Sequence, residues 1–243
     1  MKRIKLDAIG STNSFLKEMA HNSSLKDYTV VTANSQTKGK GQMGAKWSSQ
    51  SRKNLLCSVF VGFDDLNVSD QVLINYAVSI AIVKTLESYK LPKLAIKWPN
   101  DILSSSQKIC GILVENVIQK AKVKSTVIGI GLNVNQINFP SHLSKATSLK
   151  KILKHDVDLE ELLKKLITEL KLSISDVSNS KRDTLKSTYL DFLYKKNIPT
   201  MFRNSEDVLF MGIIIGVSSV GKLQIQLEDD AISEFGIKEV SIA

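Results

Sequence analysis

The sequence predicts an α+β fold in two domains, a larger one over residues 1–197 and a small all-β one over residues 198–243. Three observations lead to this prediction. With 243 residues, 43% of them hydrophobic, the chain can bury one large core plus a small appended module. Runs with strand-like and helix-like periodicity follow one another as far as about residue 197. Beyond it, short apolar runs broken by glycines predict strands alone.

The first predicted helix follows three adjacent polar residues, Ser11, Thr12 and Asn13. Apolar side chains then recur at helical spacing from Phe15 to Met19, and any of the three polar residues can cap such a helix. The same hydroxyls can also hold a ligand, because free N–H groups converge at a helix N-terminus. Capping alone and capping with ligand binding both remain open.

The other elements follow from the same periodicities. Strands are predicted at residues 28–33, 55–62, 109–117 and 126–135, and in the small module at 208–219, 222–227 and 235–242. Helices are predicted from about Ser69 to Tyr89, from a cap at Asp158 to Ile174, and from about Lys181 to Lys195. Ile198 and Pro199 mark the boundary between the two domains.

The stretch 97–116, KWPNDILSSSQKICGILVEN, is the centre of the predicted sheet. Its first strand must stop at Pro99, because proline cannot donate to a sheet ladder and forces the preceding residue into an extended conformation. A Ser-rich turn and a second apolar run follow. The layout gathers a carboxamide, a carboxylate and two ammonium groups around one hairpin, namely Asn100, Asp101, Lys97 and Lys108.

The glycine-rich segment 34–54 is long for a connection inside a compact domain, and such loops are usually functional or mobile. Its glycines at 39, 41 and 44 match the dinucleotide-binding fingerprint. Only nine residues separate the last of them from the next strand, which is too short for a crossover helix and excludes a Rossmann unit. A flexible loop with free N–H groups and nearby lysines at 38, 40 and 46 suits a polyphosphate or an acyl phosphate instead. Trp47 is either ordinary core or a flat surface for a nucleobase.

Alternation in the strand 126–135 separates two unlike faces. One face carries Ile128, Ile130, Leu132 and Val134, and the other carries Gly129, Gly131, Asn133 and Asn135. Glycine inside a strand often marks close approach of a ligand or of another backbone. We expect that here, with a bulge or tight packing as the alternative.

Charge and cysteine content limit the function classes. The net charge is +9, yet the residues from Thr200 onward include three basic and seven acidic side chains, so the excess lies in the larger domain. It indicates a solvated lysine surface, an anionic substrate, an acidic protein partner or nucleic acid. Aromatic residues do not interleave with the basic ones, which disfavours a stacking platform for single strands. Two cysteines without metal-ligand spacing, and no apolar run of membrane length, predict a cytoplasmic protein that holds no metal through cysteine.

Three motifs in order, with an early Ser-Thr-Asn, resemble the biotin protein ligase family over essentially the whole chain. They are 39-GKGQMGAKW-47, then 97-KWPND-101 with Lys108 and 111-GILVE-115, and finally 129-GIGLNV-134. The resemblance implies a mixed β-sheet flanked by helices, related to class II aminoacyl-tRNA synthetases, followed by a small C-terminal β-barrel. It also implies a short form, because no room for N-terminal DNA-binding helices precedes the Ser-Thr-Asn motif.

The resemblance implies two chemical steps. Biotin reacts with Mg-ATP to give biotinyl-5′-AMP, and a lysine of a biotin carboxyl carrier protein, from acetyl-CoA carboxylase or a related carboxylase, then takes the biotinyl group. ATP, Mg²⁺ and biotin are therefore expected, with no metal held by the protein itself. The expected partner is the carrier protein, with no nucleic acid and no membrane, and the protein is expected to be a monomer or a homodimer.

The family's functional residues carry over by position. Catalytic roles fall to Lys108, Lys40 and Asp101. The implied biotin-binding residues are Ser11, Thr12, Asn13, Gln36, Gly39, Lys40, Gly41, Lys108 and Gly111. The implied ATP-binding residues are Trp47, Lys97, Asn100, Lys108 and Asn133.

This sequence departs from the family pattern within the loop. Lys40, Gln42 and Ala45 stand where many members have arginines, so fewer bidentate phosphate contacts are expected. Arg52 stands at a position that is often glycine, which leaves the loop conformation open. A lipoate ligase is the alternative enzyme, disfavoured by the WPND tetrapeptide. A basic nucleic-acid-binding module is the alternative from another class, and its affinity would fall steeply with salt.

Overall fold

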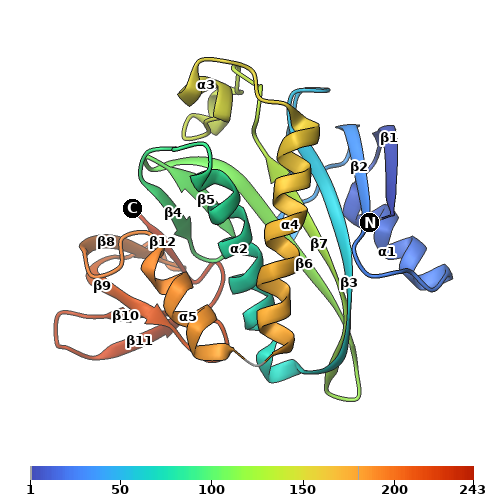
Figure 1. The fold of residues 1–243 in the computed structure, drawn as a ribbon. Helices are drawn as coiled ribbons and strands as arrows, with labels where there is room; N and C mark the ends of the chain where they lie inside the picture. Colours follow the sequence, from blue (N-terminus) through green and yellow to red (C-terminus); the bar gives the residue numbers. More distant parts are fainter. Residues whose placement is uncertain (1, 180) are drawn as a thin grey trace.

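The computed structural model describes residues 2–179 and 181–243, and its centre is a seven-stranded sheet (Figure 1). The strand order is β1-β2-β3-β7-β6-β5-β4. The strands are β1 (Arg3–Ile9), β2 (Thr29–Gln36), β3 (Leu55–Asn67), β4 (Leu94–Lys97), β5 (Asp101–Ser104), β6 (Gln107–Gln119) and β7 (Lys122–Leu132). β1 and β2 are parallel and the remaining pairs are antiparallel, so the predicted mixed sheet is confirmed.

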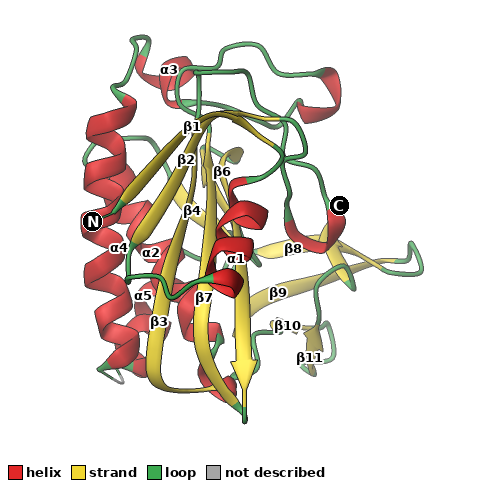
Figure 2. Cartoon of the chain, turned by 90° about the vertical axis from the view of Figure 1, so that its right-hand side faces the viewer, coloured by secondary structure: helices red, strands yellow, loops and turns green. Residues whose placement is uncertain are grey.

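Helices cover both faces of this sheet, as Figure 2 shows with α4 on the left of the strands and α1 on their other side. α1 (Thr12–Asn22) packs on one face against β3 and β7, and α2 (Val72–Glu87) and α4 (Leu159–Ser178) pack together on the other. α3 (Leu149–Leu153) and α5 (Arg182–Asp191) complete the helices of five or more residues in the described part of the chain. The alternation in β7 explains the layers, because Ile128 and Ile130 belong to the main core while Val127 packs with Leu16 of α1.

The two long helices differ in sequence because they differ in burial. α2 is apolar around its circumference and has twelve buried residues, so it is enclosed by the sheet, α4 and α5. α4 is amphipathic, and Asp158 caps it as predicted, its Oδ1 accepting from the backbone N of Glu160 at 2.7 Å and of Glu161 at 3.3 Å. The last predicted helix is shorter than expected and ends at Asp191.

The C-terminal segment forms a five-stranded antiparallel sheet, not a closed barrel. Its strands are β8 (Pro199–Asn204), β9 (Leu209–Val217), β10 (Leu223–Gln226), β11 (Ile232–Phe235) and β12 (Val240–Ile242). The order β11-β10-β9-β8-β12 leaves β11 and β12 at opposite edges. Closure would require these two to pair, and they have only four and three residues. The expected β-barrel is therefore corrected to an open sheet.

Two sequence predictions for this segment were wrong in detail. The run 235–242, expected as one strand, is interrupted by a turn in which the backbone N of Glu239 donates to Gly236 O at 3.2 Å. β8 was not expected, yet Pro199 opens it at a strand start, where a missing N–H is tolerated.

The two sheets share one hydrophobic core. Phe202, Ile214 and Leu223 of the C-terminal sheet belong to the same buried cluster as the residues of β3, β7 and α2. Trp98 adds a polar tie, since its Nε1 donates to Gly221 O at 3.0 Å. The division at residues 197 and 198 stays a prediction. Among the described helices, none combines the length and the apolar character that crossing a membrane requires.

Candidate functional site

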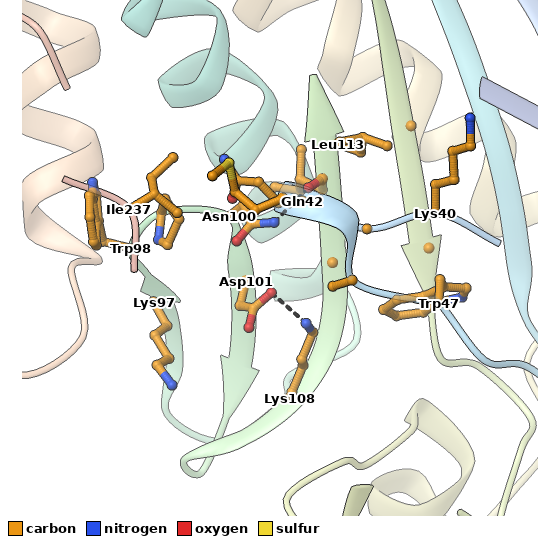
Figure 3. A pocket seen from close by; sticks show the side chains of 18 of the residues that line it. Lys40, Gln42, Trp47, Lys97, Trp98, Asn100, Asp101, Lys108, Leu113 and Ile237 are labelled. Atoms are coloured by element: carbon orange, nitrogen blue, oxygen red, sulfur yellow. Dashed lines mark hydrogen bonds and ion pairs between the residues drawn. The ribbon is translucent and has the colours of Figure 1, made fainter. Parts of the chain in front are cut away.

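A cavity of about 400 Å³ lies where the N-terminus of α1, the glycine-rich loop, the β4–β6 hairpin, β7 and the C-terminal sheet meet (Figure 3). This volume falls within the range of small-molecule sites. Its lining has two unlike parts: one wall is neutral and polar, and another region carries lysines. We call the first the polar wall (Ser11, Thr12, Asn13, Gln36, with Ser58 behind them) and the second the cationic end (Lys97, Asp101, Lys108).

The polar wall begins at the start of α1. Ser11 is the N-cap, with its Oγ 3.5 Å from the backbone N of Ser14. Thr12 donates from its backbone N to Gln36 Oε1 at 2.8 Å, and its Oγ1 lies 3.1 Å from the same oxygen. Asn13 is 3% exposed and donates to a carboxylate oxygen of Glu115 at 2.8 Å. Capping therefore falls to the first of the three polar residues, while all three also line the cavity.

The glycine-rich loop folds back on itself. Gly41 N donates to Ala45 O at 2.7 Å, and Trp47 N donates to Gly39 O at 3.0 Å. The expectation of an open loop with free N–H groups is therefore wrong for Gly41 and Trp47. Met43 occupies the left-handed region with φ 52° at the turn. The resulting narrow hairpin presents the indole of Trp47 to the cavity.

The indole lies on a floor made by two glycines that are paired across β6 and β7, Gly111 and Gly131. A Cβ on Gly131 would stand 2.5 Å from Trp47 Cε2, and one on Gly111 would stand 2.8 Å from Cζ3. Any larger residue at Gly131 would displace the ring. Of the two interpretations of the glycine face, tight packing is what the structure shows, with the ring of this chain's own tryptophan as the approaching group.

At the cationic end, Lys108 and Asp101 point toward one another, with Nζ and Oδ1 2.6 Å apart (Figure 3). Lys108 is fixed by its backbone, because its N donates to Lys145 O at 2.7 Å and its O accepts from Thr147 N at 2.8 Å. Its ammonium also lies 5.7 Å from the centroid of the Trp47 ring. Lys97 lies on the other side of Asp101 in this view.

Asn100 shapes the corner of the hairpin rather than standing free in the cavity. Its Nδ2 donates to Ile112 O at 2.8 Å, and Ile112 N donates back to Asn100 O at 2.9 Å. This reciprocal pair fixes the polar corner after Pro99 against β6. Asp101 is thereby held opposite Lys108.

The C-terminal sheet supplies a third part of the lining. Lys238 Nζ donates to Met43 O at 3.1 Å, which ties the turn before β12 to the tip of the glycine-rich loop. Apolar side chains from the same sheet face the cavity: Phe202, Ile214, Leu223, Ile237, Val240 and Ile242. The cavity is thus completed by a segment far away in sequence.

Cys57 lines the cavity but offers no nucleophile. Burial raises the pKa of its thiol to about 12, so the thiolate is scarce at neutral pH. Cys57 and Cys110 are both buried and unpaired, as predicted. The described residues contain no cluster of three or more metal-ligating side chains.

Comparison with known proteins identifies the family. Residues 6–133, slightly more than half of the chain, match the biotin/lipoate A/B protein ligase family. The chain belongs to this family.

Individual relatives of this ligase family agree. The bifunctional ligase/repressor BirA of Bacillus spizizenii is 29% identical over 238 residues, which is 96% of this chain and 70% of that protein. The biotin--[acetyl-CoA-carboxylase] ligase of Mycobacterium tuberculosis is 32% identical over 175 residues, or 70% of this chain and 63% of that protein. Biotin protein ligase from Aquifex aeolicus, solved with biotin and ATP, matches with a TM-score of 0.77 and 28% identity, covering 100% of this chain and 98% of that one.

The structure brings together most of the site residues expected from the resemblance to the ligase family. Those that line the cavity are Ser11, Thr12, Asn13, Gln36, Lys40, Gly41, Trp47, Lys97, Asn100, Asp101, Lys108 and Gly111. Gly39 and Asn133 are buried next to it and lie outside the lining. The sequence reasoning missed Ser58, Glu115 and Lys238. Of these, only Glu115 carried a signal, as the charged residue that ends the apolar run GILV.

Proposed function

We propose that the protein is an ATP-dependent biotin protein ligase, which activates biotin as biotinyl-5′-AMP and transfers it to a lysine of a biotin carboxyl carrier protein. The family match and the names of the relatives support this activity. The single observation that carries it is one cavity joining a neutral hydrogen-bonding wall to a lysine ammonium. Such a cavity suits a neutral ring at one end and a developing polyanion at the other.

Biotin occupies the polar wall in this proposal, with its ring toward Thr12 and Gln36 and its carboxylate toward Lys108. Direct contacts fall to Ser11, Thr12, Asn13, Gln36, Lys40, Gly41, Lys108 and Gly111, with Gly39 supporting the loop. ATP lies along Trp47, Lys97, Asn100 and Lys108, with Asn133 supporting β7. Trp47 offers an aromatic face for the base, at the place where its ring meets Lys108.

In the first step, a carboxylate oxygen of biotin attacks the α-phosphorus of ATP and pyrophosphate leaves. Two anions must approach each other, so the barrier depends on fixed positive charge at the reacting oxygens. Lys108 supplies this charge. In the free protein Asp101 holds that ammonium at 2.6 Å, and the arriving substrates take over part of this interaction. Lys40 lies on the loop that covers the reacting groups and adds a second cation.

In the second step, the neutral amine of a carrier lysine attacks the carbonyl carbon of the mixed anhydride. An amide bond forms, the carbonyl–phosphate bond breaks, and AMP leaves with the electron pair. The proton lost by the attacking amine passes to the phosphate of the departing AMP or to solvent. Asp101, the acidic residue among the described residues that line the cavity, is positioned to orient the amine. Lys108 stabilises the departing phosphate.

Magnesium is proposed to arrive with the nucleotide. Mg²⁺ is commonly bound by one or two carboxylates together with substrate phosphates, and Asp101 offers one carboxylate at the right end of the cavity. The described residues provide no preformed cage for the ion. The ion would neutralise phosphate charge, while the lysines position the reacting oxygens.

The remaining assignments follow from the same proposal. The carrier belongs to acetyl-CoA carboxylase or a related carboxylase, in line with the name of the mycobacterial relative. Two buried, unpaired thiols support a reducing cytoplasm. We further propose a monomer or homodimer that uses neither nucleic acid nor a membrane, with a catalytic domain over residues 1–197 and the C-terminal sheet as a second domain over 198–243.

Thermal unfolding with small molecules tests the function. Biotin with Mg-ATP is expected to raise the midpoint strongly, because ligand at 100 times its Kd stabilises by about 2.7 kcal/mol. Lipoate with Mg-ATP is expected to have little effect. Incubation with a carrier domain, followed by mass spectrometry, is expected to show one added biotinyl group. Equal stabilisation by lipoate would favour the lipoate ligase, and no response to either acid would reject both.

A further inference from the structure

We propose that Glu115 is a positioning residue that sets the hydrogen-bond polarity of the polar wall, so that Thr12 presents an acceptor to the cavity beside a donor from Gln36. The inference rests on the proposed function, because it concerns how the biotin ring is recognised. Glu115 lies on β6, outside the residues that line the cavity. It acts through Asn13 and Ser58 on Thr12, and we call this chain of hydrogen bonds the relay.

The starting point is the charge of Glu115. Its two carboxylate oxygens accept from Asn13 Nδ2 at 2.8 Å and from Lys17 Nζ at 2.6 Å. Partial burial opposes ionisation of this carboxyl, but its hydrogen bonds to Lys17 and Asn13 outweigh that effect and lower its pKa. At neutral pH it is therefore a carboxylate, which can only accept hydrogen bonds.

That charge orients the Asn13 amide. The NH₂ group faces Glu115 at 2.8 Å and, more distantly, Leu113 O at 3.4 Å, so Oδ1 faces the opposite way, toward Ser58 Oγ at 2.7 Å. Asn13 is wedged in this position, because a Cβ on Gly129 would lie 2.5 Å from its Oδ1. An amide oxygen can only accept, so the single hydroxyl proton of Ser58 is committed to Asn13.

The next contact decides the direction of the Thr12 hydroxyl. Ser58 Oγ and Thr12 Oγ1 are 2.8 Å apart, and Thr12 Oγ1 and Gln36 Oε1 are 3.1 Å apart. Because Ser58 has no proton left, the shorter contact is a hydrogen bond only if Thr12 donates to Ser58. Gln36 Oε1 keeps the backbone N–H of Thr12 as its donor at 2.8 Å. The hydroxyls of Ser58 and Thr12 thus make three oxygen–oxygen contacts with only two protons, so one contact carries no proton. The carboxylate of Glu115 decides which contact that is.

The wall facing the cavity then has a defined pattern. The lone pair of Thr12 Oγ1 is open to a ligand N–H. Gln36 also lines the cavity, and because its Oε1 is occupied, the group that it can offer a ligand is its Nε2 donor, which lies beside Gly39. A cyclic urea presents an N–H and a C=O side by side, which is the complement of this pair. Ser58 is fully buried and Thr12 is 4% exposed, so water does not randomise the pattern.

Replacing Glu115 with Gln is expected to reverse the relay. Lys17 would keep the new carbonyl oxygen, which turns the new NH₂ toward Asn13. Asn13 would then flip and donate to Ser58, and Ser58 would donate to Thr12. The Thr12 proton, no longer held by Ser58, would turn to Gln36 Oε1, 3.1 Å away, or to the cavity. The N–H of the bound ring would then meet a hydroxyl whose proton is not fixed away from the cavity.

Calorimetric titration of biotin into four single or double variants tests the relay. Glu115→Gln is expected to weaken biotin binding about tenfold, or about 1.4 kcal/mol, while the KM for ATP stays unchanged. Lys17→Met removes the same ion pair from the other side but keeps the carboxylate, so it is expected to bind biotin like the unmodified protein. Thr12→Val removes the hydroxyl, and in that background Glu115→Gln is expected to add little, because both changes act on one hydrogen bond.

The outcomes separate the claims. Additive effects of Glu115→Gln and Thr12→Val, an equal loss in Lys17→Met, or full affinity in Glu115→Gln would overturn the relay while leaving the ligase intact. Failure of the unmodified protein to bind biotin would instead reject the proposed function. If Glu115→Gln does not fold, as judged by circular dichroism, Ser58→Ala with and without Thr12→Val carries the same additivity test.

Discussion

The polar wall and the cationic end of the cavity are built in opposite ways. In the polar wall, Thr12 and Asn13 are at most 4% exposed and are hydrogen-bonded to other protein groups. At the cationic end, the side chains of Lys108 and Asp101 are 37% and 21% exposed and depend on one ion pair. A neutral ring can be recognised by a network fixed in advance. A polyanion needs cations that exchange a protein partner for the substrate. The two ends should therefore respond differently to mutation.

Lys108→Ala is expected to produce the largest effect, because it removes the charge at the reacting oxygens. Adenylate formation should slow by about 10²–10³-fold, the range for a lost group that stabilises developing charge. Biotin affinity should change far less. Single-turnover formation of biotinyl-5′-AMP and calorimetric binding of biotin measure the two quantities separately.

Lys164→Ala is the matched control for charge, since this exposed lysine lies on α4, on the face of the sheet opposite α1. Removing Lys108 also leaves Asp101 without its partner. The double variant Asp101→Asn, Lys108→Ala should remain slow. Recovery of the rate in the double variant would show that an unpaired carboxylate, not a missing ammonium, causes the defect.

Gly131→Ala is expected to come next, because it acts on the floor shared by both ends. Its Cβ would stand 2.5 Å from Trp47 Cε2, so the ring must leave its place. We expect ATP affinity to fall by about tenfold, in line with the ~1–3 kcal/mol of a base stacked on an aromatic side chain. Gly216→Ala is the control, since its Cβ would meet a neighbour only at 3.4 Å. Unchanged nucleotide binding in Gly131→Ala would exclude Trp47 from the nucleotide site.

Ser58→Ala should affect the polar wall alone. It leaves Asn13 Oδ1 without its donor, which costs about 1–3 kcal/mol of folding stability for a buried group and weakens biotin binding by about tenfold. The adenylation rate at saturating biotin should be preserved. Ser79→Ala is a matched control, because Ser79 is equally buried and its hydroxyl has no partner in the described structure. A slower rate at saturating biotin in Ser58→Ala would contradict the separation of the two ends.

The same contrast determines what the sequence could predict. Pro99 ends β4 and places Asp101 beside Lys108 within one hairpin, so local rules were sufficient for the cationic end. Asp158 capped α4 for the same local reason. The polar wall depends on pairs distant in sequence: Ser58 lies inside an apolar run and bonds to Thr12, 46 positions away. No periodicity carries that information.

The C-terminal sheet shows the limit more clearly. β9 and β10 were predicted from apolar runs broken by glycines, but barrel closure depends on whether β11 and β12 can pair, and both are too short. Its place beside the cavity depends on docking through Trp98 and on burial of Phe202. The closed hairpin of the glycine-rich loop was also missed. Glycine spacing indicates a backbone with conformational freedom, but it does not show that the hydrogen bond from Gly41 N to Ala45 O closes the loop.

Lys238→Met is expected to have the smallest effect. It tests whether the C-terminal sheet acts on the polar wall or on the cationic end of the cavity. The substitution keeps an unbranched side chain but removes the donor to Met43 O. An exposed hydrogen bond of this kind contributes about 0.5–1 kcal/mol, so the KM for biotin should rise two- to fivefold through a less well placed loop. Lys222→Met is the control for charge, since Lys222 is exposed on the same sheet segment and outside the cavity lining. If only the KM for ATP rises, Lys238 acts as a cation for the phosphates, and the C-terminal sheet belongs to the cationic end.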